Sequence, residues 1–420
     1  MRKRPNWSTG FTQRFASYDP SIKQALTNRH VIWLHAVSVG EIKICAQIIR
    51  ALEPRVPNAT IVVSCTTSTG MEEYRKILPN RILKIYYPLD RRKYVRAAIA
   101  TINPQAIIMV ESEIWPNFLW RAQDFKIPVF LANARLSPRS YPRYVKFGWL
   151  FRPLFASFAG VACKNPDDVT MLKNVGCVPD RIHIAGNLKF DASANPDRRD
   201  IDVPAMLRHI GFPEDALILV AGSTHDGEEA ILAEMFVRLR RKHPKLYLIL
   251  VPRHAERSKA IGEQLRSAGV KFVFRSEVGS SPRLKTGEVD CLLVNTTGEL
   301  IHFYEPATIA FIGKSITTDG GQNPIEPAAF GKPVICGPNM QNFLDVMDIF
   351  QKQKAVIQVT GAPDLEKTID SLLTDPARRA DLGRRARQVV TENLGAVQRT
   401  VDMIMPFLAL RGVFIARDKK

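Results

Sequence analysis

The chain has 420 residues, too many for one ordinary domain and suited to two domains of about 200 residues each. Hydrophobic residues make up 45% and charged residues 24% of the sequence, a balance that excludes a disordered or fibrous chain. No apolar run reaches the roughly 18 residues that span a bilayer, and the first residues lead into no apolar segment typical of a signal peptide. The six cysteines are scattered, so we expect them to be reduced core residues of a cytosolic protein.

The net charge of +18 is concentrated in the first half of the chain. Residues 1–200 hold 30 lysines and arginines against 15 acidic residues, whereas residues 201–420 hold 29 against 26. We therefore expect the first half to face an anionic partner: nucleic acid, a phosphorylated ligand or an acidic membrane surface. The alternative is a basic face that is simply solvated.

Short apolar runs alternate with amphipathic stretches along the first half. The stretch 41–52 has helical spacing, whereas the short apolar runs are predicted to be strands. These runs are 31–37, 61–65, 82–86, 106–110, 129–132 and 161–163. Such alternation predicts βαβ units around a parallel sheet.

A polar, proline-containing segment at 192–203 interrupts the pattern and predicts a linker around 192–205. A second alternating series follows, with helices from Asp226 and from Ala255 and a helical tail over 376–410. The apolar runs of this series are 217–221, 246–251, 271–274, 291–295, 309–313 and 333–337. We therefore predict two doubly wound α/β domains facing a cleft, with ligands beyond the carboxyl ends of the strands.

Three acidic residues of the first half follow predicted strands. Glu41 lies after His35–Gly40 at the start of a helix, where it is either a carboxylate favoured by the helix dipole or a general base. Glu111 and Glu113 follow the run 106–110 directly, and carboxylates in an apolar setting are costly unless they are paired or used, which favours function. Arg135, after the next strand, either pairs with one of them or binds substrate.

Other cationic and hydroxyl residues also follow predicted strands. Lys189 is either an exposed lysine or a point charge for a phosphate or carboxylate. Ser223 and Thr224 form either an anion cradle or a plain helix N-cap. Arg253 follows the run 246–251 and can clamp a phosphate with two hydrogen bonds.

Gly320 and Gly321 precede a helix that we predict to open at Asn323–Pro324, which would leave bare backbone N–H groups for a phosphate. Glu326, one turn into that helix, could reach the hydroxyls of a ribose. A Walker loop and a dinucleotide-binding glycine fingerprint are both missing, which argues against an NTPase or a dehydrogenase. The histidines at 225, 254 and 302 lie in separate loops, so we expect no metal site.

Eight motifs of the chain occur in the order and spacing of those in bacterial 3-deoxy-D-manno-octulosonic acid (Kdo) transferases. They are HAVSVGE, ESEIWPN, NARLS, GNLKFD, GSTHDGEE, VPRHAER, TGEL and GGQNPIEPAAFGKPVICGP. The resemblance runs from about Trp7 to the C-terminus. The family usually has histidine where this chain has Gln322 and Asn339, and proline where it has Ala255.

The resemblance implies a GT-B fold, with two Rossmann-like domains. An acceptor domain at 1–200 would bind the lipid A precursor, a donor domain at 201–395 would bind CMP-Kdo, and a helix within 396–420 would pack back on the first domain. Glu41 would be the catalytic base of an inverting transfer, and Glu111 and Lys189 would stabilise the transition state. The CMP-binding residues would be Pro252, Arg253, Thr297, Gly298, Glu299, Asn323, Pro324, Ile325 and Glu326. The leaving CMP would need no metal and no other cofactor.

The family usually begins with an apolar membrane anchor ahead of a basic stretch, and this sequence starts at the basic stretch. We expect either that an anchor has been removed or that the protein holds the cytoplasmic face of the bacterial inner membrane peripherally, through its basic face. The alternatives are another GT-B nucleotide-sugar transferase, a nucleotide-sugar epimerase and a basic nucleic-acid-binding protein. The strand-end carboxylates would repel nucleic acid, so we expect none as a partner.

Overall fold

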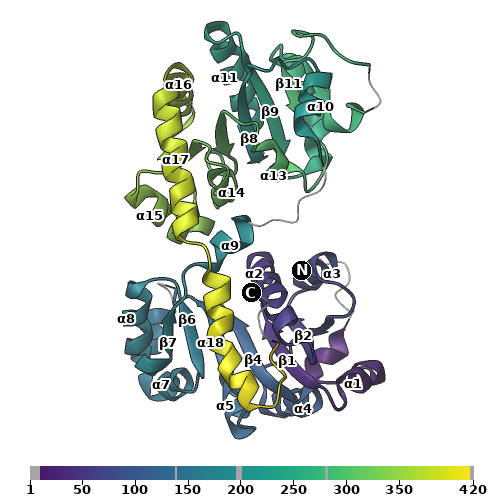
Figure 1. Ribbon diagram of the computed structural model, residues 1–420, viewed down its shortest axis with the longest axis vertical. Helices are drawn as coiled ribbons and strands as arrows, with labels where there is room; N and C mark the ends of the chain where they lie inside the picture. Colours follow the sequence, from purple (N-terminus) through teal and green to yellow (C-terminus); the bar gives the residue numbers. More distant parts are fainter. Residues whose placement is uncertain (1–9, 138–139, 195–200, 280–281, 417–420) are drawn as a thin grey trace. The chain divides into compact units, whose positions relative to one another are not determined.

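The computed structural model describes residues 10–137, 140–194, 201–279 and 282–416. The chain divides into two units, each built around one parallel seven-stranded sheet (Figure 1). Unit 1 comprises Met1–Ala192 and Asn393–Lys420, and unit 2 comprises Ser193–Glu392. The last residues of the chain therefore belong to the same unit as the first.

The sheet of unit 1 has the strand order β3-β2-β1-β4-β5-β6-β7, and all its described pairings are parallel. Its central strands are apolar on both faces because helices cover both sides. The strands are β1 (His30–His35), β2 (Ala59–Cys65), β3 (Leu83–Tyr86), β4 (Pro104–Val110), β5 (Val129–Ala134), β6 (Gly160–Cys163) and β7 (Ile182–Ile184).

Alternate residues of β1 enter the two cores of unit 1. Ile32 and Leu34 pack with α2, α3 and α18, whereas Val31 and Trp33 pack with α1, α4, α5, α7 and α8. The α-helices are α1 (Pro20–Leu26), α2 (Val39–Leu52), α3 (Ser68–Ile77), α4 (Arg92–Ile102), α5 (Pro116–Asp124), α6 (Tyr141–Lys146), α7 (Gly148–Ala156), α8 (Pro166–Val175), α9 (Leu188–Ala194) and α18 (Ala396–Leu410). Short 3₁₀ helices are η1 (Phe11–Phe15), η2 (Glu53–Arg55) and η3 (Pro179–Arg181).

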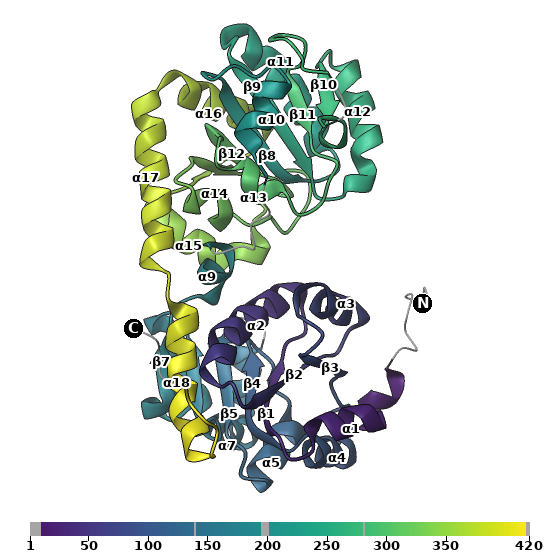
Figure 2. The same ribbon diagram turned by 45° about the vertical axis from the view of Figure 1, so that its right-hand side comes forward.

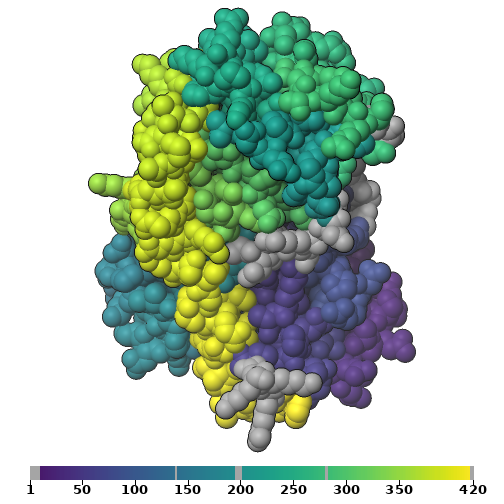
Figure 3. All heavy atoms as spheres, turned by 45° about the horizontal axis from the view of Figure 1, so that its top comes forward, coloured from purple at the N-terminus to yellow at the C-terminus, as the bar shows by residue number. Residues whose placement is uncertain are grey.

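The C-terminal helix α18 completes one face of unit 1. It packs on α2, β4 and β6, and Figure 3 shows it as a yellow ridge between purple and teal segments of the same unit. Its start is fixed by Asp191, whose carboxylate accepts the backbone N–H groups of Gly395 (2.8 Å) and Val397 (3.0 Å). The Asp of the GNLKFD motif is thus a cap for a helix 200 residues further along the chain.

The sheet of unit 2 has the order β10-β11-β9-β8-β12-β13-β14 and is parallel throughout its described pairings. The first strand, β8, lies at its centre (Figure 2). The strands are β8 (Leu217–Thr224), β9 (Leu246–Pro252), β10 (Phe272–Phe274), β11 (Cys291–Leu293), β12 (Ile309–Ile312), β13 (Val334–Cys336) and β14 (Ile357–Gln358).

Helices cover both faces of this second sheet as well. One core joins β8 to α11, α12, α16 and α17, and the other joins it to α10 and α13. The helices are α10 (Val203–His209), α11 (Glu228–Lys242), η4 (Ala255–Arg257), α12 (Ser258–Ser267), η5 (Arg275–Glu277), α13 (Leu300–Phe303), α14 (Ile325–Ala329), η6 (Gln341–Phe343), α15 (Leu344–Lys352), α16 (Ala362–Thr374) and α17 (Pro376–Glu392).

The predicted pair of doubly wound α/β domains is confirmed, and several local predictions are wrong in detail. Two edge strands, β7 and β14, escaped prediction because they are short and carry His183 and Gln358 among few apolar residues. The predicted helical tail is two helices, α17 and α18, because the chain turns at Gly395 with a φ of 85°. The linker predicted around 192–205 includes the end of α9 and the start of α10, and its residues 195–200 lie outside the described part of the chain.

All six cysteines are buried and free. Within the described residues, no helix combines the length and the apolar character that crossing a bilayer requires.

Candidate active site

In unit 1, the carboxyl ends of β1 and β4 carry the acidic residues that the sequence singled out. These two strands are neighbours, and the chain winds outwards from them in opposite directions, so they form the topological switch point of the sheet. Open α/β sheets bind ligands at such a point. Glu41 follows β1, and Glu111 and Glu113 follow β4. We call these three residues the carboxylate cluster.

Glu41 is the third residue of α2 and closes a capping box with Ser38. Its carboxylate accepts the backbone N–H of Val37 at 2.8 Å and the Ser38 hydroxyl at 2.9 Å. Glu41 is thus a helix-start carboxylate, as one of the two interpretations has it, and it lies at the switch point, where the other interpretation would need it. Burial, followed by the negative charges of Glu111 and Glu113, raises the pKa of Glu41 to about 7. A carboxyl group with that pKa can accept a proton near neutral pH.

Glu111 is held in a sparsely populated backbone conformation at the end of β4. Its φ is 61°, and its side chain is 8% exposed. Asn133, also with a positive φ of 53°, donates its side-chain amide to Glu111 at 3.3 Å and accepts the backbone N–H of Leu188 at 3.2 Å. Such strained residues cluster at functional sites. Asn133 thus links Glu111 to the start of α9, which carries Lys189 as its second residue.

Two rings, those of partly buried Trp115 and of buried His35, contact Glu113. The Trp115 indole N–H donates to Glu113 at 2.7 Å, and the Nε2 atom of buried His35 lies 3.6 Å from the same carboxylate. The His35 ring stacks on Tyr87 with 3.9 Å between centroids, and its Nδ1 atom lies 2.9 Å from the Ser64 hydroxyl. These contacts fix Glu113 beside the base candidate, where its charge raises the pKa of Glu41.

We expect the Glu113→Gln variant to shift the pH dependence of activity to lower pH. Removing this negative charge lowers the pKa of Glu41, while glutamine still accepts the Trp115 hydrogen bond. The measurement is kcat/KM as a function of pH. Asp180→Asn, which removes an exposed carboxylate of the same unit, is the control and should leave the profile in place. If the Glu113→Gln profile coincides with that of the wild type, the charge of Glu113 does not influence the pKa of Glu41.

In unit 2, cationic and imidazole side chains gather where β8, β9 and β12 end. The rings of His225 and His254 lie 5.7 Å apart, edge to face, and Lys314 is close enough to His225 for its charge to contribute to lowering the pKa of that ring, after desolvation. Arg253 precedes His254 and is exposed, and none of the ion pairs among the described residues includes it. We call Arg253, His225, His254 and Lys314 the basic cluster, which suits an anionic ligand.

Glu228 organises the loops that carry the basic cluster. It is 1% exposed, and its carboxylate accepts four backbone N–H groups. The donors are His225 (2.9 Å), Lys314 (2.7 Å), Ser315 (2.9 Å) and Ile316 (3.0 Å). One buried carboxylate therefore fixes the loop after β8 to the loop after β12.

The other predicted donor-binding segments lie at the same edge of this sheet. Pro252 is the buried last residue of β9, and Thr297, Gly298 and Glu299 follow β11. Glu299 is already paired, because its carboxylate accepts from Arg275 at 2.8 Å. Residues 323–326 follow the loop after β12. Glu326 accepts from the Asn323 side chain at 3.1 Å, and its charge adds to the burial that raises the pKa of Tyr304, the residue that follows α13.

The structure corrects the prediction of a phosphate cradle at Gly320–Gly321. The N–H of Gly320 donates to the Gln341 side chain at 2.7 Å, and that of Gly321 donates to the Lys314 carbonyl at 2.8 Å, so neither is bare. Both glycines instead allow the loop to fold onto Met340 and Asn342, where a Cβ atom would clash. The helix that we predicted to open at Asn323–Pro324 is the five-residue α14, which begins at Ile325 and has Glu326 in its first turn.

Two further sequence-based alternatives are wrong. Neither Ser223 nor Thr224 caps α11, because Gly227 is its N-cap and the Thr224 hydroxyl donates to Glu229 at 3.0 Å. Ser223 has a φ of 55°, and so introduces strain at the end of β8. The ion pair suggested for Arg135 is not among those formed by the described residues, and its backbone N–H bonds the Glu111 carbonyl at 3.3 Å.

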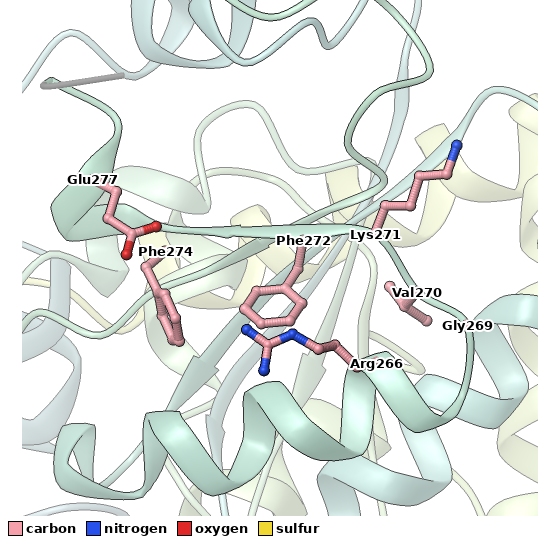
Figure 4. Close-up of a pocket in the computed structure, with 7 residues that line it drawn as sticks. All are labelled: Arg266, Gly269, Val270, Lys271, Phe272, Phe274 and Glu277. Carbon is pink, nitrogen blue, oxygen red and sulfur yellow. The ribbon is translucent and has the colours of Figure 1, made fainter. Parts of the chain in front are cut away.

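A hollow of about 460 Å³ lies elsewhere in unit 2, by the edge strand β10 (Figure 4). The Arg266 guanidinium lies against the Phe272 ring, 5.2 Å from its centroid, and the Lys271 side chain points away from it. None of the sequence-predicted site residues lines this hollow. In the described part of the chain, no three His, Cys, Asp or Glu side chains come together as a metal site.

Sequence reasoning missed the roles of Glu228, Asn133 and Lys314. The signal for Glu228 was its place two residues after the His225–Asp226 turn, but a pattern cannot show that its side chain also accepts three N–H groups from the loop after β12. Lys314 follows a strand directly, as the residues that we did select do. Asn133 was part of a motif, and its left-handed backbone became evident only in the fold.

Two parallel doubly wound sheets, each with charged side chains at the carboxyl ends of its central strands, are the architecture of glycosyltransferases of the GT-B fold. Residues 283–389 match the family described as glycosyl transferases group 1. A solved UDP-GlcNAc 2-epimerase from Neisseria meningitidis, bound to UDP-GlcNAc, is 13% identical, covers 91% of this chain and 100% of its own, and has a TM-score of 0.60. At this identity the likeness concerns the fold alone.

Residues 9–192 match the family described as 3-deoxy-D-manno-octulosonic-acid transferase. A 3-deoxy-D-manno-octulosonic acid transferase from Haemophilus influenzae is 32% identical over 90% of this chain and 87% of its own length. A transferase with the same description from Bordetella pertussis is 31% identical over the same shares. The chain belongs to the Kdo transferase family.

Proposed function

We propose that this Kdo transferase moves Kdo from CMP-Kdo to a lipid A precursor in lipopolysaccharide biosynthesis, by direct displacement with inversion. Unit 1 would bind the acceptor and unit 2 the donor. The observation that carries the proposal is the place of Glu41 at the switch point of unit 1, where burial and the charges of Glu111 and Glu113 raise its pKa to about 7. A group with that pKa is half deprotonated near neutral pH and can take a proton from an acceptor hydroxyl.

In the proposed mechanism Glu41 removes the proton of an acceptor hydroxyl, which attacks the anomeric carbon of Kdo as CMP leaves. Glu111 and Lys189 stabilise the charge that develops at the reacting sugar. Asn133 holds Glu111 in place relative to the start of α9, because it hydrogen-bonds both Glu111 and Leu188. Arg253 and Lys314, the permanently charged members of the basic cluster, neutralise the departing phosphate. No proton needs to reach CMP, since a phosphate monoester is stable as an anion at neutral pH.

The donor is assigned to unit 2 because its strand ends gather cationic side chains around β8, the first strand of that sheet. Pro252, Thr297, Gly298 and residues 323–326 would contact the nucleoside. Glu326 would reach the ribose hydroxyls directly from the first turn of α14, and Glu299 would act through its ion pair with Arg275.

We expect the Arg253→Ala variant to bind CMP about 1.5–3 kcal/mol more weakly, the typical loss for a charged hydrogen bond. The exposed guanidinium is replaced without disturbing a core, so folding should be unchanged. Titration calorimetry with CMP measures the effect, and Arg283→Ala, another exposed arginine of unit 2, is the control. Equal affinities for wild type and Arg253→Ala would place the phosphate elsewhere.

The epimerase alternative predicts a different product. UDP-GlcNAc 2-epimerases share the fold at 12–13% identity, whereas the Kdo transferases match at 25–32%. The direct test incubates the protein with CMP-Kdo, generated in situ, and a tetraacylated lipid A precursor, and reads the products by mass spectrometry. Added Kdo masses are expected. If the protein binds CMP but adds no Kdo mass, the nucleotide site is supported and the lipid A precursor is not the acceptor.

A lipid acceptor requires the protein to work at a membrane surface. The basic first half supports an anionic one, and we propose the cytoplasmic face of the inner membrane, where the precursor and cytosolic CMP-Kdo can meet.

A further inference from the structure

An apolar and basic edge of unit 1 has no role in the carboxylate cluster. Helices α6 and α7, with Phe147 between them, expose Val145 (46%), Phe147 (44%) and Trp149 (79%) within five residues of one another. Exposed aromatic residues at this density on a surface mark an interaction site. Figure 1 shows α7 at the margin of unit 1, next to α8.

The charge of this segment has one sign. Between Asp124 and Asp167 the sequence has no acidic residue. It has seven basic ones over the same stretch: Lys126, Arg135, Arg139, Arg143, Lys146, Arg152 and Lys164. Three of these, Arg143, Lys146 and Arg152, are exposed on α6 and α7 themselves. Such an edge complements a surface that is both anionic and apolar just below its charges.

The opposite side of the two helices is anchored, so the exposed residues are presented by a fixed structure. The Tyr144 ring lies edge to face against Phe151 and Phe155, with 4.8 and 5.3 Å between centroids. Leu154 and Phe155 are buried in the core of unit 1. Val145, Phe147 and Trp149 are therefore not displaced core residues but the outward side of a packed helix pair.

The edge also adjoins the carboxylate cluster. Helix α6 follows β5, whose residue Asn133 holds Glu111. The charge of Glu113 adds to the burial that raises the pKa of Tyr144 on α6, which places that helix within electrostatic reach of the cluster. A lipid delivered at this edge would arrive next to the residues proposed to act on it.

We propose that α6 and α7 form the membrane-docking edge of the protein, in which Val145, Phe147 and Trp149 enter the headgroup region of an anionic phospholipid bilayer. Arg143, Lys146 and Arg152 meet the lipid phosphates around them. Tryptophan favours this interfacial depth, and long basic side chains reach the headgroups from it. The inference rests on the proposed function for its purpose, because a membrane lipid is there the acceptor.

The test measures partitioning of the full-length chain onto vesicles by sedimentation. The vesicles are phosphatidylethanolamine with phosphatidylglycerol at about 3:1, or phosphatidylcholine alone. We expect Phe147→Ser/Trp149→Ser, and separately Arg143→Glu/Lys146→Glu/Arg152→Glu, to reduce partitioning onto the anionic vesicles at least about tenfold. The matched controls in unit 2 are Leu344→Ser and Lys259→Glu/Lys285→Glu/Lys367→Glu, which should bind as the wild type does.

Three outcomes would overturn the docking edge: wild-type binding by both edge variants, equal binding to both vesicle types, or a dimer that the edge variants dissociate while vesicle binding persists. Thermal melts verify that each variant is folded. Transfer to a deacylated, water-soluble acceptor separates the two proposals, since the edge variants should retain wild-type rates there. If the edge variants bind vesicles less well but no protein transfers Kdo, the wild type included, the proposed function is refuted and the docking edge is still supported.

Discussion

The Glu41→Gln variant should transfer Kdo about 10²–10⁴-fold more slowly than the wild type and bind CMP with unchanged affinity. Glutamine keeps the shape of the capping box, since its oxygen can accept from Val37 and its amide can donate to Ser38, but it cannot take a proton. Transfer assays and calorimetry measure the two quantities. A variant with wild-type rates would remove Glu41 from the reaction, and one that lost CMP would move it to the donor site.

The pH dependence of the wild type follows from the same residue. The base acts in its ionised form, so kcat/KM should rise with pH through about 7 and level off above it. The raised pKa also affects stability. Between its ordinary value of 4.5 and about 7 the folded chain binds a proton that the unfolded chain has released, so stability contributed by the neutral form is lost as pH rises.

This linkage amounts to at most roughly 3.5 kcal/mol, because one pKa unit corresponds to about 1.4 kcal/mol. Glu41→Gln should therefore melt at a higher temperature than the wild type at pH 8 and at a similar temperature near pH 5. The expected variant is inactive but more stable, which distinguishes loss of a base from loss of the fold. A variant less stable than the wild type at pH 8 would contradict the raised pKa.

The Glu228→Gln variant should lose both stability and donor affinity. In wild-type Glu228 each carboxylate oxygen accepts two backbone N–H groups. The NH2 group of glutamine would replace one of these oxygens and cannot accept, so two of the four donors would be unsatisfied in a buried site. At about 1–3 kcal/mol each, the loss is about 2–6 kcal/mol, or roughly 4–24 °C in the melting temperature of a unit of this size. CMP affinity should fall at least about tenfold, because the loops bearing His225 and Lys314 lose their common anchor.

Calorimetric melts and CMP titration of Glu228→Gln test this expectation. Glu234→Gln on the exposed side of the same helix is the control and should stay within about 0.5 kcal/mol of the wild type. If Glu228→Gln melts and binds CMP as the control does, the buried carboxylate does not hold the two loops.

The two α/β domains could be predicted from the sequence, because strands buried on both faces appear as apolar runs and helices appear as amphipathic stretches. It failed at β7 and β14, whose edge positions leave few apolar residues to detect. It located Glu41, Glu111 and Arg253 at strand ends, since parallel strands bring their carboxyl ends to one edge. It could not show that Gly320 and Gly321 use their N–H groups within the protein, which depends on contacts with Lys314 and Gln341.

The place of α18 has a consequence for synthesis on the ribosome. Val401, Ile404 and Leu408 share a core with Ile32 and Leu34, so the earliest and latest parts of the message encode one hydrophobic interior. Domains usually fold in the order of translation. Here Ser193–Glu392 is continuous and can fold as soon as it emerges, whereas the N-terminal unit must wait with an open face until the last helix is released. Translation that stops after Glu392 should therefore yield a chain with a folded unit 2 and an incomplete unit 1, whose exposed apolar face promotes aggregation.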